Sequence, residues 1–428
     1  MRHIVLFLAF FVFDVAAYGQ SNSLHCYIEA AKRNSPLLND YRNRMQIEQD
    51  ELQRLKAMYR HSLLDVNGDY LFVPIVSKDG GRTSFQWNAR DATDYYGYDL
   101  GESSGFLHAG VTWTQPLLGN QSYRVAQEQS RITTEIARNH LRMEEHRLER
   151  AVTEQYLLCL LDKKQTAFAD SVGAVLARQE EIVGRLVENG LAKESDLRLI
   201  DIERRANEEL HLSSMQSYHT HLMDLNLLCG IADTADVALE DAVVELRQPF
   251  VYDGSLFTEQ YQLDSLNTEA SLHSFNLQYK PRLDLFVNGG LQVGDYAGWY
   301  RHFGWSAGVT FRWKIFDGRQ RRWKQRQAEL QQHSIRTYRE NAEYQRQMRL
   351  NQCLAELDKY NRREDALKRR LEGYAEVLSD YAKEMEDGQV SVLDYITVLR
   401  SRIQAERDCM LLQANRQLVV VTCNYWNY

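Results

Sequence analysis

Several short segments of the chain alternate apolar and polar residues with a period of two. In WSAGVTFRWKIF (305–316), every second residue from Trp305 to Ile315 is apolar, and LDLFVNGGLQV (283–293) and LHAGVTWTQ (107–115) follow the same rule. A period of two places the apolar side chains on one face of a strand and the polar ones on the other. We therefore predict strands at residues 62–76, 105–116, 283–293 and 304–316, the last with Arg312 and Lys314 on its polar face.

The predicted strands have the length and composition of membrane-crossing strands. About 9 to 11 residues allow a tilted strand to cross a bilayer, and tryptophans near strand ends suit the membrane interface. Four strands cannot close a barrel, because single-chain barrels begin at about eight strands and lipid does not tolerate open sheet edges. Strands that span a membrane would therefore come from several chains sharing one barrel. The alternative is a soluble hairpin packed on a helix.

Long polar segments without helix breakers lie between the strands. Residues 120–189 contain no proline and only two glycines before Gly190, so they can form one helix of about 105 Å at 1.5 Å per residue. A second such helix is predicted at residues 317–387. Helices of this length cannot be buried in a compact globule and need lateral neighbours, as in a coiled coil or a helical barrel. Shorter helices are predicted at residues 36–60, 194–229, 255–279 and 391–421.

The second half of the chain repeats the first at an offset of 198 residues. Matched pairs include Arg124/Arg322, Gln129/Gln327, Gly190/Gly388, Asp196/Asp394, Arg204/Arg402 and Glu208/Glu406. An ungapped offset held over about a hundred residues indicates an internal duplication. We predict two structural repeats, 20–230 and 255–428, joined by a connector at 231–254. The β-hairpins of the two repeats would occupy residues 62–116 and 282–316.

The N-terminus resembles a secretory leader. Residues 1–19 have a basic start, a short apolar run and small residues before a cut after Gly19, so we expect export. The net charge of −8 argues against nucleic acid as a partner. Six scattered cysteines without a CxxC motif are interpreted as small apolar packing residues rather than disulfides. No P-loop, nucleophile elbow, HExxH motif or consistent histidine spacing is present, so we expect neither an enzyme nor a bound cofactor or metal.

With these features, the chain resembles the TolC family of outer-membrane efflux and secretion channels. The resemblance is carried by Asn34-Ser35-Pro36 near the start, by the junctions Leu117–Asn120 and Ile315–Gly318, and by the twin turns Gly190–Asp196 and Gly388–Asp394. It implies a mostly helical fold in which three chains share a 12-stranded outer-membrane β-barrel and a periplasmic α-barrel. It also implies a passive exit duct of a Gram-negative outer membrane, opened by a periplasmic adaptor and an inner-membrane pump. Residues 77–104 and 294–303 would be surface loops, and residues 231–254 a band around the tunnel.

The twin turns allow both local and functional interpretations. Glycine after a long helix takes the left-handed conformation that ends it, and the resemblance implies that Gly190, Leu191, Gly388 and Gln389 dock the adaptor. Asp196 and Asp394 have two interpretations that can coexist. Each acid can cap the following helix, with Ser391 as the N-cap of the second one. Each can also line a ring of like charges at the periplasmic aperture, which favours cations.

Three positions differ from the pattern of well-known relatives. Met385 stands where they have tyrosine, Val390 where they have arginine, and Thr397 where a second acid is common, so the aperture is expected to close differently. The competing function is a periplasmic coiled-coil adaptor or scaffold without a channel. Adaptors normally have one helical hairpin, so the duplication and the paired amphipathic strands favour the channel.

Overall fold

A computed structural model describes residues 22–72, 75–79, 82–86, 105–233, 235, 237–250, 255–293, 303–386 and 389–428. The leader predicted at residues 1–19 lies outside the described residues. The chain divides into two compact units, one formed by residues 1–39, 141–257 and 342–428 and the other by residues 40–140 and 258–341. Each unit therefore takes segments from both predicted repeats.

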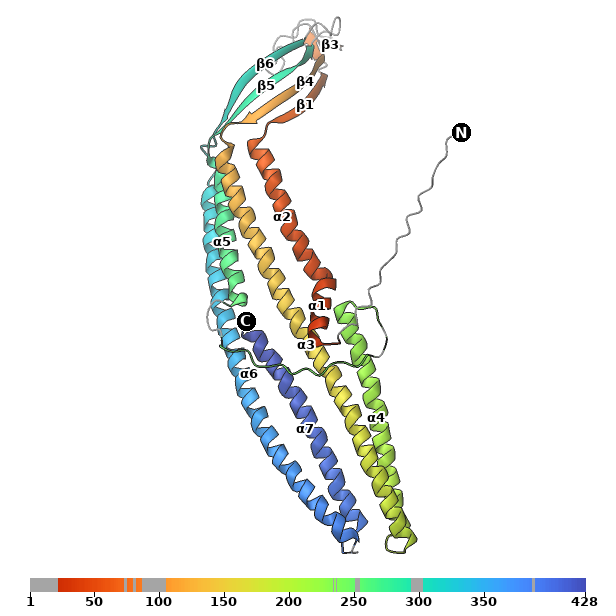
Figure 1. Ribbon diagram of the computed structural model, residues 1–428. Helices are drawn as coiled ribbons and strands as arrows, with labels where there is room; N and C mark the ends of the chain where they lie inside the picture. The colour runs from red at the N-terminus through yellow and green to blue at the C-terminus, as the bar shows by residue number, and fades with distance from the viewer. Residues whose placement is uncertain are drawn as a thin grey trace, which may run out of the picture. The chain divides into compact units, whose positions relative to one another are not determined.

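The described helices follow the predicted plan closely (Figure 1). Pro36 occupies the first position of α2, where its missing N–H would have no helical partner anyway. α3 runs unbroken for 70 residues, in agreement with the long helix expected at residues 120–189. The helices are α1 Leu24–Asn34, α2 Pro36–Arg60, α3 Gly119–Glu188, α4 Glu194–Cys229, α5 Leu256–Asn276, the 3₁₀ turn η1 Leu277–Tyr279, α6 Gln320–Glu386 and α7 Val392–Trp426.

The second long helix begins later than predicted. Residues 317–319 form a turn instead, in which Gly318 and Arg319 both have positive φ, 62° and 69°. The Asp317 carboxylate accepts the backbone N–H groups of Arg319 and Arg321 at 2.9 and 2.7 Å. Asp317 thus satisfies N–H groups at the helix start that have no intrahelical acceptor, and the helix begins at Gln320.

The unit that contains residues 40–140 and 258–341 holds a four-stranded antiparallel sheet. Its strand order is β1-β4-β5-β6, so β1 and β6 are its edges (Figure 1). A separate two-stranded hairpin, β2-β3, lies mostly within the range expected to be a surface loop. The strands are β1 Leu63–Phe72, β2 Ile75–Asp79, β3 Arg82–Gln86, β4 Gly105–Pro116, β5 Arg282–Val293 and β6 Phe303–Arg312.

β6 ends four residues before the predicted boundary at residue 316. Arg312 pairs with Arg282, which is the first residue of β5. Pro281 precedes Arg282 and lacks the N–H that a longer ladder would need. Residues 313–316 therefore have no strand to pair with, and the apolar alternation continues beyond the hydrogen-bonded strand.

The other unit has a core where α1, α3, α4 and α7 meet. Tyr27, Val152, Tyr156, Leu225 and Cys229 are buried there together. The end of α4 is set by Gly230, whose φ of 63° lies in the left-handed region that favours glycine. The Asn34 amide donates to the carbonyl oxygens of Cys229 and Gly230 at 2.9 and 3.1 Å, which joins the end of α1 to the end of α4.

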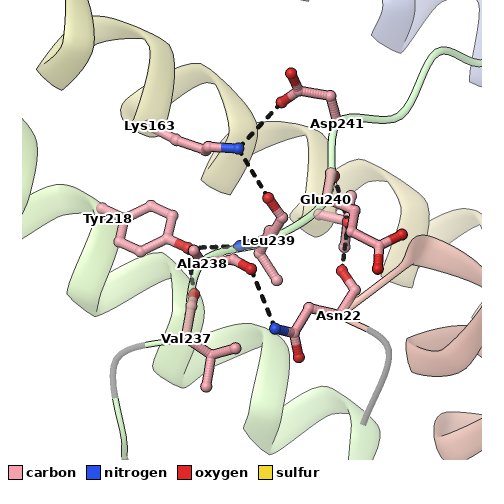
Figure 2. Close-up of polar contacts among 9 residues, drawn as sticks. Asn22, Lys163, Tyr218, Val237, Ala238, Leu239, Glu240 and Asp241 are labelled. Carbon is pink, nitrogen blue, oxygen red and sulfur yellow. Dashed lines mark hydrogen bonds and ion pairs between the residues drawn. The ribbon is translucent and has the colours of Figure 1, made fainter. Parts of the chain in front are cut away.

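The described part of the connector is neither helix nor strand, and side chains of the helices and of Asn22 hold it through hydrogen bonds to its carbonyl groups. The Tyr218 hydroxyl of α4 donates to the Val237 carbonyl at 2.6 Å, and the Asn22 amide donates to the Ala238 carbonyl at 3.1 Å (Figure 2). From α3, the Lys163 ammonium donates to the Leu239 carbonyl at 2.8 Å and pairs with Asp241 at 3.2 Å (Figure 2). Side chains thus supply the partners that a segment outside any helix or sheet would otherwise lack.

Candidate functional site

The strand register gathers the apolar positions onto one face of the four-stranded sheet. Residues directly opposite one another on neighbouring strands share a face. Leu64 lies opposite Trp113, Trp113 opposite Val287, and Val287 opposite Ala307, so one row crosses all four strands. The adjacent row on this face is Val66, Val111, Gly289 and Trp305. We call this surface the apolar sheet face; it also includes Leu285, Val309 and Phe311.

The apolar sheet face is uncovered in the single chain. Val66 is 82% exposed, Trp305 77%, Leu64 69% and Phe311 63%. A contiguous apolar surface of this kind marks a membrane or protein contact. The alternative of a soluble hairpin covering a helix would require these side chains to be buried, and they are not.

The opposite face of the sheet is polar. Asp65, Thr112, Asn288 and Ser306 form one row across the four strands. Asn67 lies in the neighbouring row of this face, and its amide donates to the Thr112 hydroxyl at 3.3 Å. We call this surface the polar sheet face, and it is suited to contact with water.

The two cations predicted for the polar face have different positions. Arg312 is on that face, opposite Arg282 at the end of the β5–β6 ladder. Lys314 is not part of the strand, because β6 has already ended. Its ammonium donates to the Gln278 side chain at 3.2 Å and lies 5.6 Å from the ring centre of Tyr279. The prediction was therefore wrong for Lys314.

The first of the twin turns joins α3 to α4. Gly190 has a φ of 73°, which confirms that this glycine ends the helix in the left-handed conformation. Its N–H donates to the Val187 carbonyl at 2.9 Å, and the Leu191 N–H donates to the Leu186 carbonyl at 2.8 Å. These two bonds form a Schellman motif. The Leu191 side chain is 71% exposed at the turn.

The second turn joins α6 to α7 and repeats two of the hydrogen bonds of the first turn. The N–H groups of Gln389 and Val390 donate to the Glu384 carbonyl at 2.8 and 3.3 Å. In the first turn the equivalent donors, Leu191 and Ala192, both bond to Leu186. Gly388, the predicted counterpart of Gly190, lies outside the described residues. The repeat seen in the sequence is therefore also a repeat of backbone geometry.

Asp196 caps its helix as predicted, whereas at the second turn the cap is Ser391 and the prediction was wrong for the Asp394 carboxylate. The Asp196 carboxylate accepts the Lys193 N–H at 3.1 Å, which is the acid half of a capping box. At the second turn, the Ser391 hydroxyl oxygen accepts the Asp394 N–H at 3.2 Å, and the Ser391 hydroxyl lies 2.6 Å from Asp394 Oδ2. The acid there contacts the serine side chain rather than the serine N–H. The second role considered for the aspartates, lining an aperture, stays a prediction.

Met385 belongs to an apolar cluster that was not predicted from the sequence. It is 5% exposed and packs with Leu378, Tyr395 and Ile396 of the α6–α7 hairpin. Residues of the α3–α4 hairpin complete the cluster; they are Val172, Leu176, Val183 and Ile200. We call this group the tip cluster. The spacing of Val392, Tyr395, Ile396 and Leu399 was its sequence signal, since residues at i, i+3, i+4 and i+7 share a helix face.

The other two unusual positions near the second turn have simple local roles. The Thr397 hydroxyl donates to the Leu393 carbonyl of its own helix at 2.8 Å. Val390 is half-buried and contributes its N–H to the turn. An ion pair between Arg400 of α7 and Glu203 of α4 links the two hairpins near the tip cluster. Contacts between hairpins thus hold this region together within one chain.

No helix in the described part of the chain has both the length and the apolar character needed to cross a membrane. The described residues also contain no group of three or more His, Cys, Asp or Glu side chains placed to hold a metal ion.

Comparisons with known proteins agree with this architecture. No protein-family model and no curated protein matches the chain. Among solved structures, the outer membrane protein VceC from Vibrio cholerae is 13% identical, with a TM-score of 0.71 over 94% of this chain and 96% of that one. The MtrE outer membrane channel of Neisseria gonorrhoeae is 14% identical, with a TM-score of 0.69 over 94% and 88%. The CmeC outer membrane channel of Campylobacter jejuni is 12% identical, with a TM-score of 0.67 over 94% and 85%.

These structures are described as channels or outer membrane proteins and not as enzymes. The likeness covers 94% of this chain in each case and at least 85% of the other chain. The fold predicted from the duplicated strand and helix plan is confirmed. The chain has the fold of the TolC-type outer-membrane efflux channels.

Proposed function

We propose that the chain is the outer-membrane exit duct of an efflux or type I secretion system in a Gram-negative bacterium. The observation that carries this proposal is the apolar sheet face, which is exposed across all four strands. Lipid is the partner expected for a sheet that has one apolar face and one polar face. A barrel strand in a membrane needs this alternation, with apolar residues toward lipid and polar residues toward the lumen.

The sheet edges require more than one chain. The backbone groups on the outer sides of β1 and β6 have no strand partner within the described sheet. In a bilayer, unpaired backbone groups cost several kcal/mol each, by order of magnitude, so the edges must pair with other copies. Three copies would supply twelve strands, and the number three rests on the resemblance to TolC-type channels.

The helical hairpins would form the periplasmic part of the duct. The twin turns are compact and exposed at Leu191 and Gln389, which suits docking of an adaptor protein. Gly190 and Gly388 would support that contact by setting the turns. Asp196 and Asp394 would line the aperture, where a ring of carboxylates favours cations. Transport would be passive, with the energy supplied by an inner-membrane pump.

The competing function is a periplasmic adaptor or scaffold. Such a protein would work in water, where an exposed apolar face of this extent promotes aggregation. The uncovered side chains of Trp305, Val309 and Phe311 therefore favour the channel.

Fractionation of cells that express the full chain tests the proposal. We expect the protein in the outer membrane, and detergent extracts should contain a trimer that dissociates only on heating. In planar bilayers the purified trimer should give discrete conductance steps. A monomer recovered from the soluble periplasmic fraction would contradict the channel and favour the scaffold.

A further inference from the structure

Apolar side chains continue past the end of β6 toward the helices. Ile315 and Phe316 follow the strand and are 81% and 84% exposed. The Trp313 indole N–H donates to the Tyr279 carbonyl at 3.1 Å, which holds this segment beside η1, at the end of the sheet where α6 begins (Figure 1). Aromatic residues at the ends of membrane strands are typical of the interface between hydrocarbon and head groups. The segment therefore extends the apolar sheet face toward the level of lipid head groups.

Cations surround this apolar segment. Residues 312–326 contain seven cations and a single acid, Asp317. The Asp317 carboxylate is already engaged by backbone N–H groups at the start of α6. Arg312 is on the polar sheet face, and we call the other six cations the basic segment; they are Lys314, Arg319, Arg321, Arg322, Lys324 and Arg326.

The first repeat has no such charge at the equivalent place. At the offset of 198 residues, residues 114–128 join β4 to α3 and contain one cation, Arg124, and one acid, Glu128. Both junctions connect a strand to a long helix. The fold therefore does not require the basic segment, which is a property of the second junction.

Two cations of the basic segment fix the start of α6 to η1. The Arg321 Nε donates to the Asn276 side chain at 3.0 Å, and its guanidinium carbon lies 5.7 Å from the ring centre of Tyr279. The Lys314 ammonium contacts the same ring. The basic segment is thus held at the same end of the sheet as the exposed Ile315 and Phe316.

The other cations of the basic segment are mostly uncompensated. No carboxylate in the described part of the chain forms an ion pair with Arg319, Arg322 or Lys324, whereas Arg326 pairs with Glu329 at 3.2 Å. Arg319, Arg322 and Arg326 are exposed. Clustered charge of one sign raises the local concentration of the opposite charge. An anion held next to an apolar surface matches both features of this junction.

We propose that the basic segment binds the head groups of anionic phospholipids in the leaflet on the helix side of the membrane. The inference rests on the proposed function, which places the apolar sheet face in lipid. A phosphate anchored at that leaflet meets Arg and Lys side chains, which form charge-assisted hydrogen bonds with it. A zwitterionic lipid carries a compensating cation and is therefore bound less well. Because the first junction lacks the charge, each chain contributes one such site.

The lipid preference of reconstituted protein tests the proposal. The full-length protein is placed in phosphatidylcholine vesicles with a trace of phosphatidylglycerol or phosphatidylcholine that has a nitroxide on one acyl chain. Electron paramagnetic resonance measures the fraction of each label that the protein immobilises, which gives the relative association constant. Phosphatidylglycerol should associate about fivefold more strongly, the factor that one favourable Lys or Arg contact supplies. High salt should reduce this preference.

Removal of the uncompensated cations should abolish most of the preference. The test variant is Arg319→Gln/Arg322→Gln/Lys324→Gln. Its matched control removes two arginines and one lysine from exposed positions in the part of α6 that belongs to the other unit, and should retain the preference. The control substitutions are Lys359→Gln, Arg363→Gln and Arg369→Gln.

The possible outcomes separate this inference from the proposed function. Incorporation into vesicles with equal association of the two labels would overturn the inference and leave the channel intact. Equal losses in the test and control variants would indicate a general effect of net charge and would also overturn it. A changed ion selectivity in planar bilayers with an unchanged lipid preference would place these cations toward the lumen, again overturning it. Failure to enter vesicles of any composition would contradict the proposed function and the inference together.

Discussion

Ser391 and Asp394 hold the first turn of α7 through two contacts. The Ser391 hydroxyl oxygen accepts the Asp394 N–H at 3.2 Å, and the same hydroxyl lies 2.6 Å from Asp394 Oδ2. Because the hydroxyl can accept from the N–H while donating to the carboxylate, one side chain satisfies the helix start and orients the acid. The cap and the negative charge are thus coupled, yet separate substitutions can remove each of them.

Removal of the cap should affect stability. Ser391→Ala leaves the Asp394 N–H without its side-chain acceptor, which typically lowers the free energy of unfolding by about 1 kcal/mol. Ser401→Ala is the control, since the Ser401 hydroxyl donates to the Thr397 carbonyl within its own helix and does not cap a helix start. Chemical denaturation of the detergent-solubilised protein measures the difference. Equal losses in the two variants would rule out a capping role for Ser391.

Removal of the charge should affect ion block. Asp394→Asn retains a side chain that can accept the serine hydroxyl but lacks the negative charge. If Asp394 lines the aperture, block of single-channel current by trivalent cations should weaken at least tenfold in concentration, an order-of-magnitude expectation for loss of a charge ring. Ser391→Ala, which keeps the charge, should retain the block. Unchanged block in Asp394→Asn would remove this residue from the aperture.

Gly190 and Gly184 should respond to alanine in opposite directions. Gly190 has a φ of 73°, and alanine in this left-handed conformation costs about 1 kcal/mol or more. Gly184 lies within α3 with nothing within 4 Å of an added Cβ, so alanine there should stabilise by about 0.5 to 1 kcal/mol. Thermal unfolding of Gly190→Ala and Gly184→Ala measures both. Stabilisation by both substitutions would contradict the left-handed turn.

His146 should make the protein less stable in acid. Its Nε2–H donates to the Tyr425 carbonyl at 2.9 Å, and its buried Nδ1 has no hydrogen-bond partner among the described residues. Burial lowers the pKa of His146 below its ordinary value of 6.5, and this outweighs the hydrogen bond to the Tyr425 carbonyl and nearby Glu149, which raise it; Arg247 and Arg150 act in the same direction as burial. The imidazole binds a proton more readily in the unfolded chain, so its contribution to stability is present above pH 6.5 and is lost as the pH falls through the folded pKa.

The pH dependence of thermal unfolding checks this prediction. Between pH 7.5 and about pH 5, the unfolding midpoint of His146→Gln should fall less than that of the unsubstituted protein. His333→Gln, at an exposed position of α6, is the control and should follow the unsubstituted protein. Parallel curves for His146→Gln and the unsubstituted protein would show that His146 does not contribute.

Local patterns predicted most of the fold. The period-two segments became β4, β5 and β6, because a strand with one buried or lipid-facing side needs that alternation. The end of β6 could not be predicted in this way, since it depends on where its partner β5 begins. Asp317 was a local signal for the start of α6, because its carboxylate accepts a backbone N–H at that helix start. The polar residues that follow it did not distinguish the turn from the helix.

The candidate site was less predictable than the fold. Gly190 and Ser391 form hydrogen bonds with residues only three positions away, so the local sequence was sufficient to predict that they end and cap a helix. Met385 is buried in one cluster with Val183 and Ile200, which lie 202 and 185 residues earlier in the chain, and such a cluster exists only once both hairpins have formed.

Spin labels on adjacent residues of β6 can show whether the apolar sheet face contacts lipid. Val309 is on that face and Thr310 is on the polar sheet face. In protein reconstituted into vesicles, a nitroxide at position 309 should collide with oxygen, which concentrates in lipid, and one at position 310 with a water-soluble nickel chelate. A label at position 309 that is accessible to the chelate and shielded from oxygen would contradict the account.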